Sequence, residues 1–204
     1  MYDAISEWAA SHRLTVHDNG TLDLAVHDAA ETYRYVLTWN WGLGPTITYV
    51  MLNPSTGTAT ANDATLRNCR AIAQHHGYGS LIVLNLFALR SREPQALYSY
   101  PDPIGPATDD ALTQLLPLGD TVIVAWGRRH SDLHDRASTV AQLLYKKGVA
   151  TQCLGINRDG TPRYVFRGSA MEPLASGLGM TVSPCRRNDL GGGVTGPGGV
   201  RRSR

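Results

Sequence analysis

Alternation between short apolar segments and longer segments of helical periodicity constrains the fold of this chain more than any other feature. Aromatic, β-branched and apolar residues predict five strands, at 32–39, 46–52, 80–85, 121–126 and 149–154. Apolar positions three or four residues apart predict helices between them, at 63–77, 108–116 and 132–147. Strands that alternate with helices form right-handed crossovers. We therefore expect an α/β protein, a three-layer α/β/α sandwich around a mainly parallel central sheet.

Length and composition favour one soluble globular domain. The chain has 204 residues, of which 42% are hydrophobic and 18% charged, and a domain commonly holds ~100–200 residues. The sequence has no apolar run of the ~18–20 residues that span a membrane, and its N-terminus does not resemble a secretory signal. Cys69, Cys153 and Cys185 are widely spaced, which argues against a disulfide framework and a zinc site. A cytoplasmic monomer with buried, reduced thiols and no membrane association is expected.

The composition changes near residue 180. Segment 181–204 contains five arginines and one acid, so it carries a charge of +4 and leaves −2 for the rest of a chain whose total is +2. Its many glycines cannot bury enough apolar surface to offset chain entropy. We expect a single domain at 1–180 and a disordered Gly/Arg-rich basic tail at 181–204. Such a tail either adds salt-sensitive affinity for a polyanion or has no binding role.

Polar residues follow each predicted strand. Asn53, Pro54, Ser55 and Thr56 come after the second strand, and residues 85–90, 126–130 and 155–160 after the next three. In an open parallel sheet, ligands bind beyond the carboxyl ends of the strands. Two asparagines, several arginines and a tryptophan at one edge suit a neutral, planar, hydrogen-bonding ligand with phosphates nearby.

These segments also resemble a known family. Met-Leu-Asn53-Pro-Ser-Thr, Asp63-Ala-Thr-Leu-Arg67, Asn85-Leu-Phe-Ala-Leu-Arg90 and Ala-Trp126-Gly resemble the bacterial and phage domain-of-unknown-function family 1643, over residues 33–160. More distantly, the order and placement of three motifs are similar to the uracil-DNA glycosylase superfamily. That resemblance implies a uracil-DNA-glycosylase-like fold, DNA as the partner and cofactor-free excision of a base.

The resemblance and the chemistry of the residues together give roles to two groups. By the resemblance, Asn53 would hold the attacking water, and by its own chemistry Asp63 would polarise that water if the loop after Asn53 folds back; these two are the expected catalytic residues. Asn85 would read the extruded base with its donor and acceptor, and an aromatic ring would stack on that base. The residues expected to bind the base are Pro54, Ser55, Thr56, Asn85, Phe87 and Trp126.

Arginines are the expected phosphate ligands. Glycosylases of the superfamily usually carry a late His-Pro-Ser segment, whereas this chain has Gly160-Thr-Pro-Arg163-Tyr164-Val-Phe-Arg167 in that place. We expect Tyr164 to replace it as a stacking wedge. The candidate phosphate ligands are Arg67, Arg90, Arg128, Arg129, Arg163 and Arg167.

The residues after Pro54 bear on the substrate. In strict uracil enzymes a tyrosine follows this proline and blocks substituents on C5, whereas Ser55, Thr56 and Gly57 are all small. This difference predicts a pyrimidine with a bulky C5 group, such as the glucosylated hydroxymethylcytosine of some phage DNA. The enzyme would then serve in anti-phage defence.

Other interpretations of the same residues stay open. Asn-Pro is also a common turn, Asp63 is placed to cap a helix, Phe87 and Trp126 suit a core, and His130 and His134 lack the glutamate of a zinc protease motif. Two other functions fit as well. One is a hydrolase or transferase of free nucleosides or nucleotides, and the other is a noncatalytic module that binds modified DNA.

Overall fold

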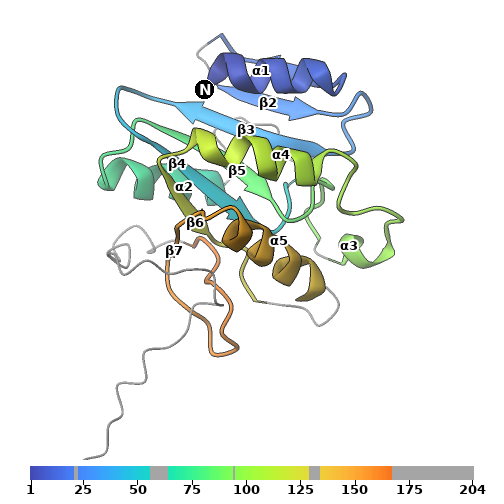
Figure 1. The fold of residues 1–204 in the computed structure, drawn as a ribbon, viewed down its shortest axis with the longest axis vertical. Coiled ribbons are helices and arrows are strands. Elements are labelled where there is room, and N and C mark those ends of the chain that lie inside the picture. The colour runs from blue at the N-terminus through green and yellow to red at the C-terminus, as the bar shows by residue number, and fades with distance from the viewer. Residues whose placement is uncertain (21–22, 56–63, 94, 129–133, 167–204) are drawn as a thin grey trace, which may run out of the picture.

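A seven-stranded mixed sheet forms the centre of the molecule (Figure 1). The computed structural model describes residues 1–20, 23–55, 64–93, 95–128 and 134–166. Along the sheet the strand order is β1-β2-β3-β5-β4-β6-β7. The strands are β1 (Thr15–Asp18), β2 (Leu24–His27), β3 (Arg34–Asn40), β4 (Thr46–Met51), β5 (Ser80–Asn85), β6 (Thr121–Val124) and β7 (Thr151–Cys153).

The sheet has a parallel half and an antiparallel half. Strands β5, β4, β6 and β7 pair in parallel, with Met51 opposite Asn85 and Val50 opposite Val124. Strands β1, β2, β3 and β5 pair antiparallel. The expectation of a mainly parallel sheet is therefore wrong for its N-terminal side. The four-residue strands β1 and β2 were too short to be recognised, and hairpin-like pairing of the first 40 residues extends the sheet antiparallel.

A close approach of two backbones joins the halves. Strand β5 lies between β3 and β4, so the connection between those two strands crosses the beginning of β5. A Cβ atom on Gly79 would lie 2.5 Å from the carbonyl oxygen of Gly42 and 2.6 Å from the carbonyl carbon of Leu43. Any larger residue at Gly79 would push this connection away from the sheet.

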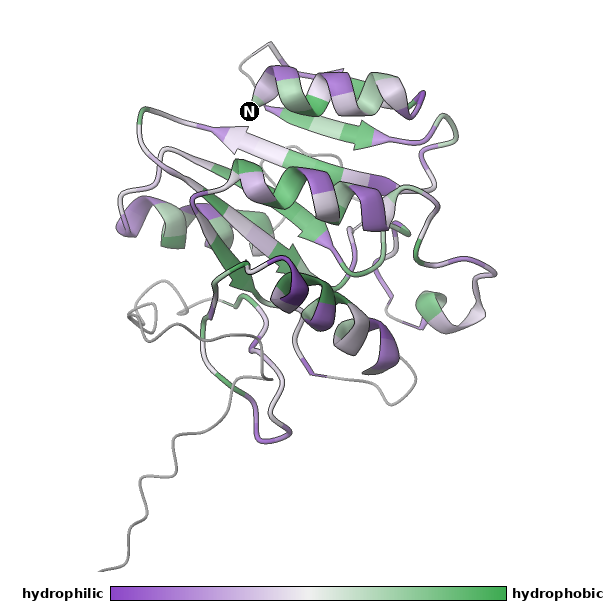
Figure 2. Cartoon of the chain, in the orientation of Figure 1, coloured by the Kyte–Doolittle hydropathy of each residue, from purple (hydrophilic) through white to green (hydrophobic). Residues whose placement is uncertain are grey.

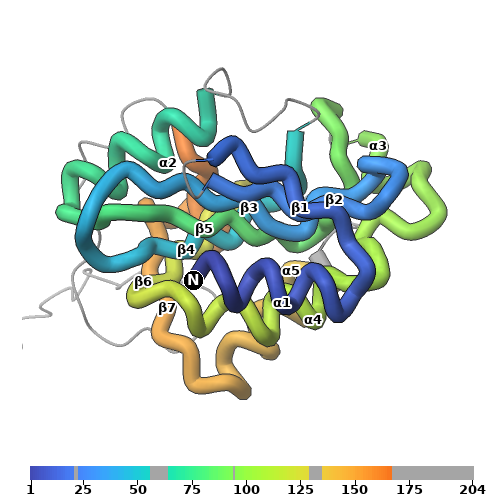
Figure 3. Tube along the Cα trace, turned by 90° about the horizontal axis from the view of Figure 1, so that it is seen from above, coloured from blue at the N-terminus to red at the C-terminus, as the bar shows by residue number. Residues whose placement is uncertain are grey.

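Helices lie on both faces of the sheet (Figure 3). On one face, α2 (Ala64–His75) packs Leu66, Cys69 and Ile72 into a core with the outer side chains of β4 and β6. On the other face, α1 (Tyr2–Ser11), α4 (Thr108–Leu115) and α5 (His134–Lys146) share a second core. Figure 2 shows that the strands are mostly apolar while the helices carry polar and apolar sides, as burial of one helix face requires. The short elements are α3 (Ala96–Ser99) and the 3-10 helix η1 (Leu116–Leu118).

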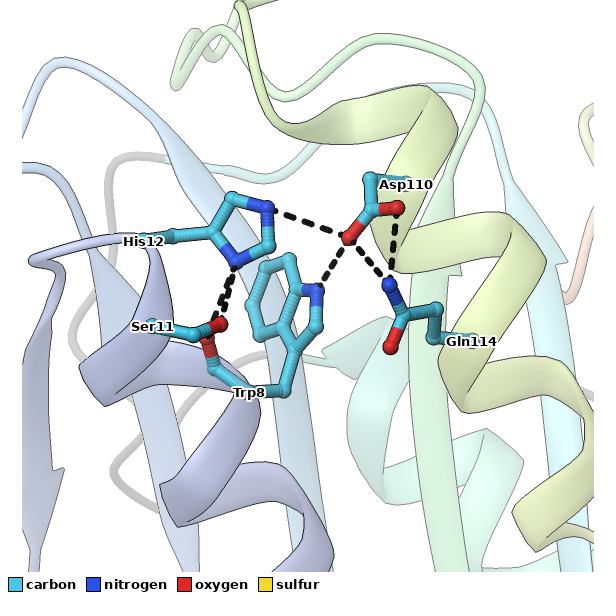
Figure 4. Close-up of polar contacts among 5 residues, drawn as sticks. All are labelled: Trp8, Ser11, His12, Asp110 and Gln114. Carbon is cyan, nitrogen blue, oxygen red and sulfur yellow. Dashed lines mark hydrogen bonds and ion pairs between the residues drawn. The ribbon is translucent and has the colours of Figure 1, made fainter.

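A polar network fastens α1 to α4 (Figure 4). The indole Nε1 of Trp8 donates a 2.8 Å hydrogen bond to Oδ2 of Asp110, and Nε2 of His12 lies 3.1 Å from the same oxygen. Gln114 donates to Asp110 from the next helical turn. Burial alone would raise the pKa of Asp110, but the bonds from Trp8 and Gln114 together with His12 lower it.

Other expectations from the sequence concern the cysteines, the segment 181–204, membrane spans and metal sites. Cys69 and Cys153 are buried free thiols, and Cys185 lies outside the described residues, as does the whole segment 181–204. Within the described ranges, no helix is long and apolar enough to cross a membrane. In those same ranges, histidines, cysteines and acids form no group of three or more that could hold a metal ion.

Candidate functional site

A pocket of about 430 Å³ opens at the carboxyl ends of β4, β5 and β6. Strand β5 flanks β4 on one side and β6 flanks it on the other, so this is the switch point at which open α/β sheets bind ligands. We call it the edge pocket. Its polar lining consists of Arg34, Asn53, Ser55, Thr65, Asn85, Ser91, Arg92, Trp126, Arg128 and Tyr164.

Asn53 is held by its amide nitrogen. Nδ2 donates to three backbone carbonyl oxygens, those of Ser91 at 3.0 Å, Pro54 at 3.2 Å and Leu89 at 3.4 Å. Since carbonyl oxygens accept only from N–H, this arrangement fixes which amide atom is the nitrogen. Among the described residues no donor bonds to Oδ1 of Asn53, so this oxygen is oriented to accept a hydrogen bond in the pocket.

Asn85 is the last residue of β5, and its side chain lines the same pocket. Only 4% of the residue is exposed, yet its amide makes no hydrogen bond to any other residue that the structure describes. Its amide atoms are not sealed from solvent, because the residue lines the open pocket and neither atom is among the fully buried polar atoms that lack a partner. Asn85 therefore offers one acceptor and two donors to a ligand.

Ser55 and Trp126 complete two walls of the edge pocket. Ser55 is half-buried and lines it, whereas the buried Pro54 supports it from behind, its carbonyl bonded to Asn53 and Ser91. Trp126 is 7% exposed, and its indole N–H finds no acceptor in the described part of the chain. This N–H is a further donor at the site that is not used in folding.

Tyr164 covers one side of the opening. Its hydroxyl lies 3.2 Å from Oγ1 of Thr65 on α2, and the residue as a whole is 42% exposed. Its Cβ packs against Gly127, where an added Cβ would lie only 3.2 Å away. Gly127 has a φ of +83°, a conformation that disfavours other residues, so a glycine here both turns the chain after β6 and admits Tyr164.

The edge pocket continues into a smaller, basic one. Arg128 lines both pockets, and the second, of about 340 Å³, is also lined by Asn157, Arg158 and Arg163. The loop that carries these residues is braced internally: Asn157 donates to Thr161 at 2.9 Å, and Asp159 accepts from the backbone and hydroxyl of Thr161. These bonds and the nearby Arg128 lower the pKa of Asp159. Three arginines around one small cavity suit a phosphate.

The structure brings some of the predicted site residues together and separates others. Asn53, Ser55, Asn85, Trp126 and Arg128 line the edge pocket, and Arg163 lines the basic pocket beside it. Phe87 does not reach either pocket; it is 3% exposed and belongs to the core under α4 and α5. Arg67 and Arg90 line a third pocket, on the α2 side of the sheet, and Arg90 pairs there with Glu31 at 2.9 Å. Thr56, Asp63, Arg129 and Arg167 lie outside the described residues.

Sequence reasoning missed three arginines at the site, Arg34, Arg92 and Arg158. Arg34 is buried at the beginning of β3 and lines the edge pocket, and Arg92 lines it from the segment after β5. A charged residue in an otherwise apolar strand is a recognisable signal, but its place in the site can be predicted only once β3 is known to lie beside β5. Arg158 follows the last predicted strand by a few residues, so its place at the carboxyl edge of the sheet was predictable.

The lining of the edge pocket limits its chemistry. Within the described ranges no carboxylate, histidine or cysteine lines it. Its polar groups are neutral amides, hydroxyls, an indole and guanidinium groups, which orient and bind rather than exchange protons at neutral pH. The arrangement can hold a water at Asn53, read a planar polar ring at Asn85 and bind phosphates at the arginines.

The fold and the pocket define an α/β protein with an amide-lined, arginine-flanked site at a switch point of its sheet. The chain belongs to the family described as "Protein of unknown function (DUF1643)", whose profile matches residues 34–164. This span includes β3 to β7 and all of the residues that line the edge pocket. No curated protein and no solved structure gives a significant match.

Proposed function

We propose that this protein is a monofunctional DNA N-glycosylase that flips out a modified pyrimidine, excises it and leaves an abasic site. The observation that carries the proposal is the pair of amides in the edge pocket. Asn53 presents an acceptor fixed by three backbone bonds, and Asn85 presents a buried amide with no bonding partner among the described residues. One suits a water, and the other suits the hydrogen-bonding edge of a base.

The chemistry requires little from the protein beyond placement. The bond from the sugar C1′ to the base nitrogen breaks, and the base departs with the electron pair. The water held by Oδ1 of Asn53 then forms the new bond to C1′ and loses a proton to solvent. Positive charge that develops on the sugar is stabilised by the DNA phosphates, and the proposed ligands of these phosphates are Arg34, Arg92 and Arg128, which line the pocket. Asp63 is proposed to polarise the water.

The wall at Ser55 supports the substrate class. Ser55 is small and lines the pocket, so its own side chain would not obstruct a substituent on C5 of a pyrimidine bound against it. The pocket volume of about 430 Å³ lies within the ~300–1,000 Å³ of small-molecule sites. We propose bulky C5 groups such as glucosylated hydroxymethyl as substrates, which would direct the enzyme against phage DNA.

We also propose that the fold is a three-layer sandwich of the uracil-DNA-glycosylase type. Helices on both faces of a parallel half-sheet, with the asparagines at neighbouring strand ends, support a three-layer, uracil-DNA-glycosylase-like arrangement. The antiparallel strands β1 to β3 are then an extension at one edge of it.

A second candidate, an enzyme of free nucleotides, has one observation in its favour. The pocket formed by Arg128, Arg158 and Arg163 is compact and directly adjoins the base-sized edge pocket. A nucleoside phosphate needs one phosphate cradle of this kind, whereas DNA needs a continuous basic face.

The test uses phage DNA that contains glucosylated hydroxymethylcytosine, beside unmodified and uracil-containing DNA, with alkali to cleave abasic sites. The proposal predicts alkali-labile breaks only in the modified DNA, and Asn53→Ala should abolish them. The control Asn68→Ala should not, because Asn68 lies on α2 and does not line the edge pocket. Binding of all three DNAs without breaks would indicate the noncatalytic module instead. If Ser55→Tyr leaves excision of the glucosylated base unimpaired, the C5 argument is wrong.

A further inference from the structure

The third pocket, which Arg67 and Arg90 line, is larger than the other two and lies on the α2 side of the antiparallel half of the sheet. Its volume is about 820 Å³, and residues of β1, β2, β3 and α2 line it. Among the described helices α2 packs on this face, and the pocket lies beside it over β2 and β3. We call it the sheet pocket. Thr65 and Leu66 of α2 line the edge pocket, and Arg67 and Arg70 line the sheet pocket, so both pockets share this helix.

The acids of the sheet pocket are engaged within the protein. Asp18 accepts from the Tyr2 hydroxyl at 2.7 Å and from the backbone of Gly20 at 2.8 Å. Asp23 accepts from the backbone of Asn40 at 2.7 Å. Glu31 binds Arg90 at 2.9 Å, and His17 lies 3.5 Å from its other oxygen. Each of these carboxylates is thus hydrogen-bonded within the protein, and Arg90 neutralises the charge of Glu31.

Arg70 has a different environment. Its guanidinium carbon lies 6.0 Å from the ring centre of Trp39 and 5.3 Å from that of Trp41, within the range of cation–π contacts. It forms no ion pair with an acid in the described part of the chain. Stacking on aromatic faces leaves the N–H groups at the edge of the guanidinium for an anion. Arg67 lies one turn earlier on the same side of α2.

His27 supplies a neutral polar group at the floor of the sheet pocket. The residue is 7% exposed, and its Nδ1 is buried without a hydrogen-bond partner among the described residues. Burial, with the positive charges of Arg90 and Arg34 nearby, lowers the pKa of His27 to about 4. The imidazole is therefore neutral at pH 7, and its ring, with Trp39 and Ala25, gives the floor a flat and mostly apolar character.

From these contacts we infer that the sheet pocket binds a nucleotide unit, with the base on the floor formed by Trp39, Ala25 and His27 and the phosphate on Arg70. A planar ring suits the aromatic floor, and an anion suits Arg70, which pairs with no acid among the residues described. The unit can come from a DNA strand that also enters the edge pocket, or from a free nucleotide. The inference does not depend on glycosylase activity.

The experiment measures affinities by calorimetry for thymidine 5′-monophosphate, thymidine, inorganic phosphate and a five-residue oligothymidylate. The protein carries Asn85→Ala, so that the edge pocket contributes less. We expect the monophosphate to bind at least tenfold more tightly than thymidine or phosphate, and Arg70→Gln to weaken it at least tenfold. Lys146→Gln, which removes one charge from the end of α5, should leave the affinity within twofold.

The two sources give different results. Equal affinities for the monophosphate and the oligothymidylate assign the pocket to free nucleotides. Tighter binding of the oligothymidylate that Arg70→Gln weakens assigns it to a strand. The inference is overturned if neither ligand binds, or if binding is unchanged in both Arg70→Gln and His27→Gln.

Discussion

The side chain of Asn53 should contribute to the stability of the fold. Asn53 donates three hydrogen bonds to backbone carbonyls, which together contribute ~1–3 kcal/mol. Asn53→Ala should therefore lower the free energy of unfolding by about this amount in urea titrations. Asn68→Ala should change it by less than ~0.5 kcal/mol, as for other substitutions away from special features. An unchanged unfolding midpoint in Asn53→Ala would show that these three bonds do not hold the strand end.

His27 predicts a dependence of stability on pH. Its pKa is about 4 in the folded protein and ~6.5 in the unfolded chain. The unfolded state therefore binds more protons between these values, so stability is complete above pH 6.5 and falls as the pH approaches 4. The expected loss in the free energy of unfolding is about 2 kcal/mol, which allows for partial solvent screening of a side chain that lines an open pocket.

The measurement is the free energy of unfolding between pH 7 and pH 4, for the wild type and His27→Gln. The variant should lose less stability over this interval. His76→Gln is the matched control, because the pKa of His76 is also lowered, by burial and by His75, but this side chain is more exposed. Parallel curves for the wild type and His27→Gln would contradict the assignment.

At the scale of elements, the contact between α1 and α4 depends on one carboxylate. Asp110 accepts hydrogen bonds from Trp8 and Gln114 and lies beside His12. Asp110→Ala leaves the indole N–H of a buried tryptophan without its acceptor, which should cost ~1–3 kcal/mol. Asp110→Asn keeps an acceptor for Trp8 and should cost less. Thermal unfolding of both variants tests this, and equal melting temperatures for the wild type and both variants would refute it.

The elements after residue 32 could be predicted from sequence because their periodicities are clear. The expected strands at 46–52 and 80–85 correspond to β4 and β5, and the expected helices at 63–77 and 132–147 correspond to α2 and α5. In the first 30 residues the signals are weaker. Strand β1 is mostly exposed and therefore lacks alternation. Helix α1 carries a short helical pattern, since Ile5, Trp8 and Ala9 lie on one face, but this pattern covers little more than one turn.

The pairing of these elements depended on contacts that periodicity does not encode. Nothing in the sequence of β3 states that it pairs with β5 rather than with β4, its neighbour along the chain. This pairing brings Arg34 to the edge pocket and separates Arg67 and Arg90 from it. The asparagines were predictable because their place at strand ends follows from the strand assignment alone.

At the scale of the whole molecule, the arginines beside the edge pocket predict how DNA binding depends on salt. Arg128 lines both the edge pocket and the basic pocket. If it contacts one phosphate, Arg128→Ala should reduce the slope of log K against log salt by about 1. Lys146→Ala, distant on the surface of α5, should leave the slope unchanged. Fluorescence anisotropy with a labelled duplex at several salt concentrations gives the slopes, and equal slopes for Arg128→Ala and the wild type would remove Arg128 from the interface.

The central claim is that the Asn85 amide, which bonds to no other described residue, is the proposed binding group for a flipped base. The most direct measurement is the single-turnover rate of base release from DNA with glucosylated hydroxymethylcytosine, with the melting temperature of the same protein samples. We predict that Asn85→Ala releases the base at least ~100-fold more slowly, a loss of more than ~2.7 kcal/mol of transition-state stabilisation. Its melting temperature should stay close to that of the wild type, since the amide of Asn85 makes no hydrogen bond to another described residue that the variant would lose. A lower melting temperature with an unchanged rate of release would contradict the claim.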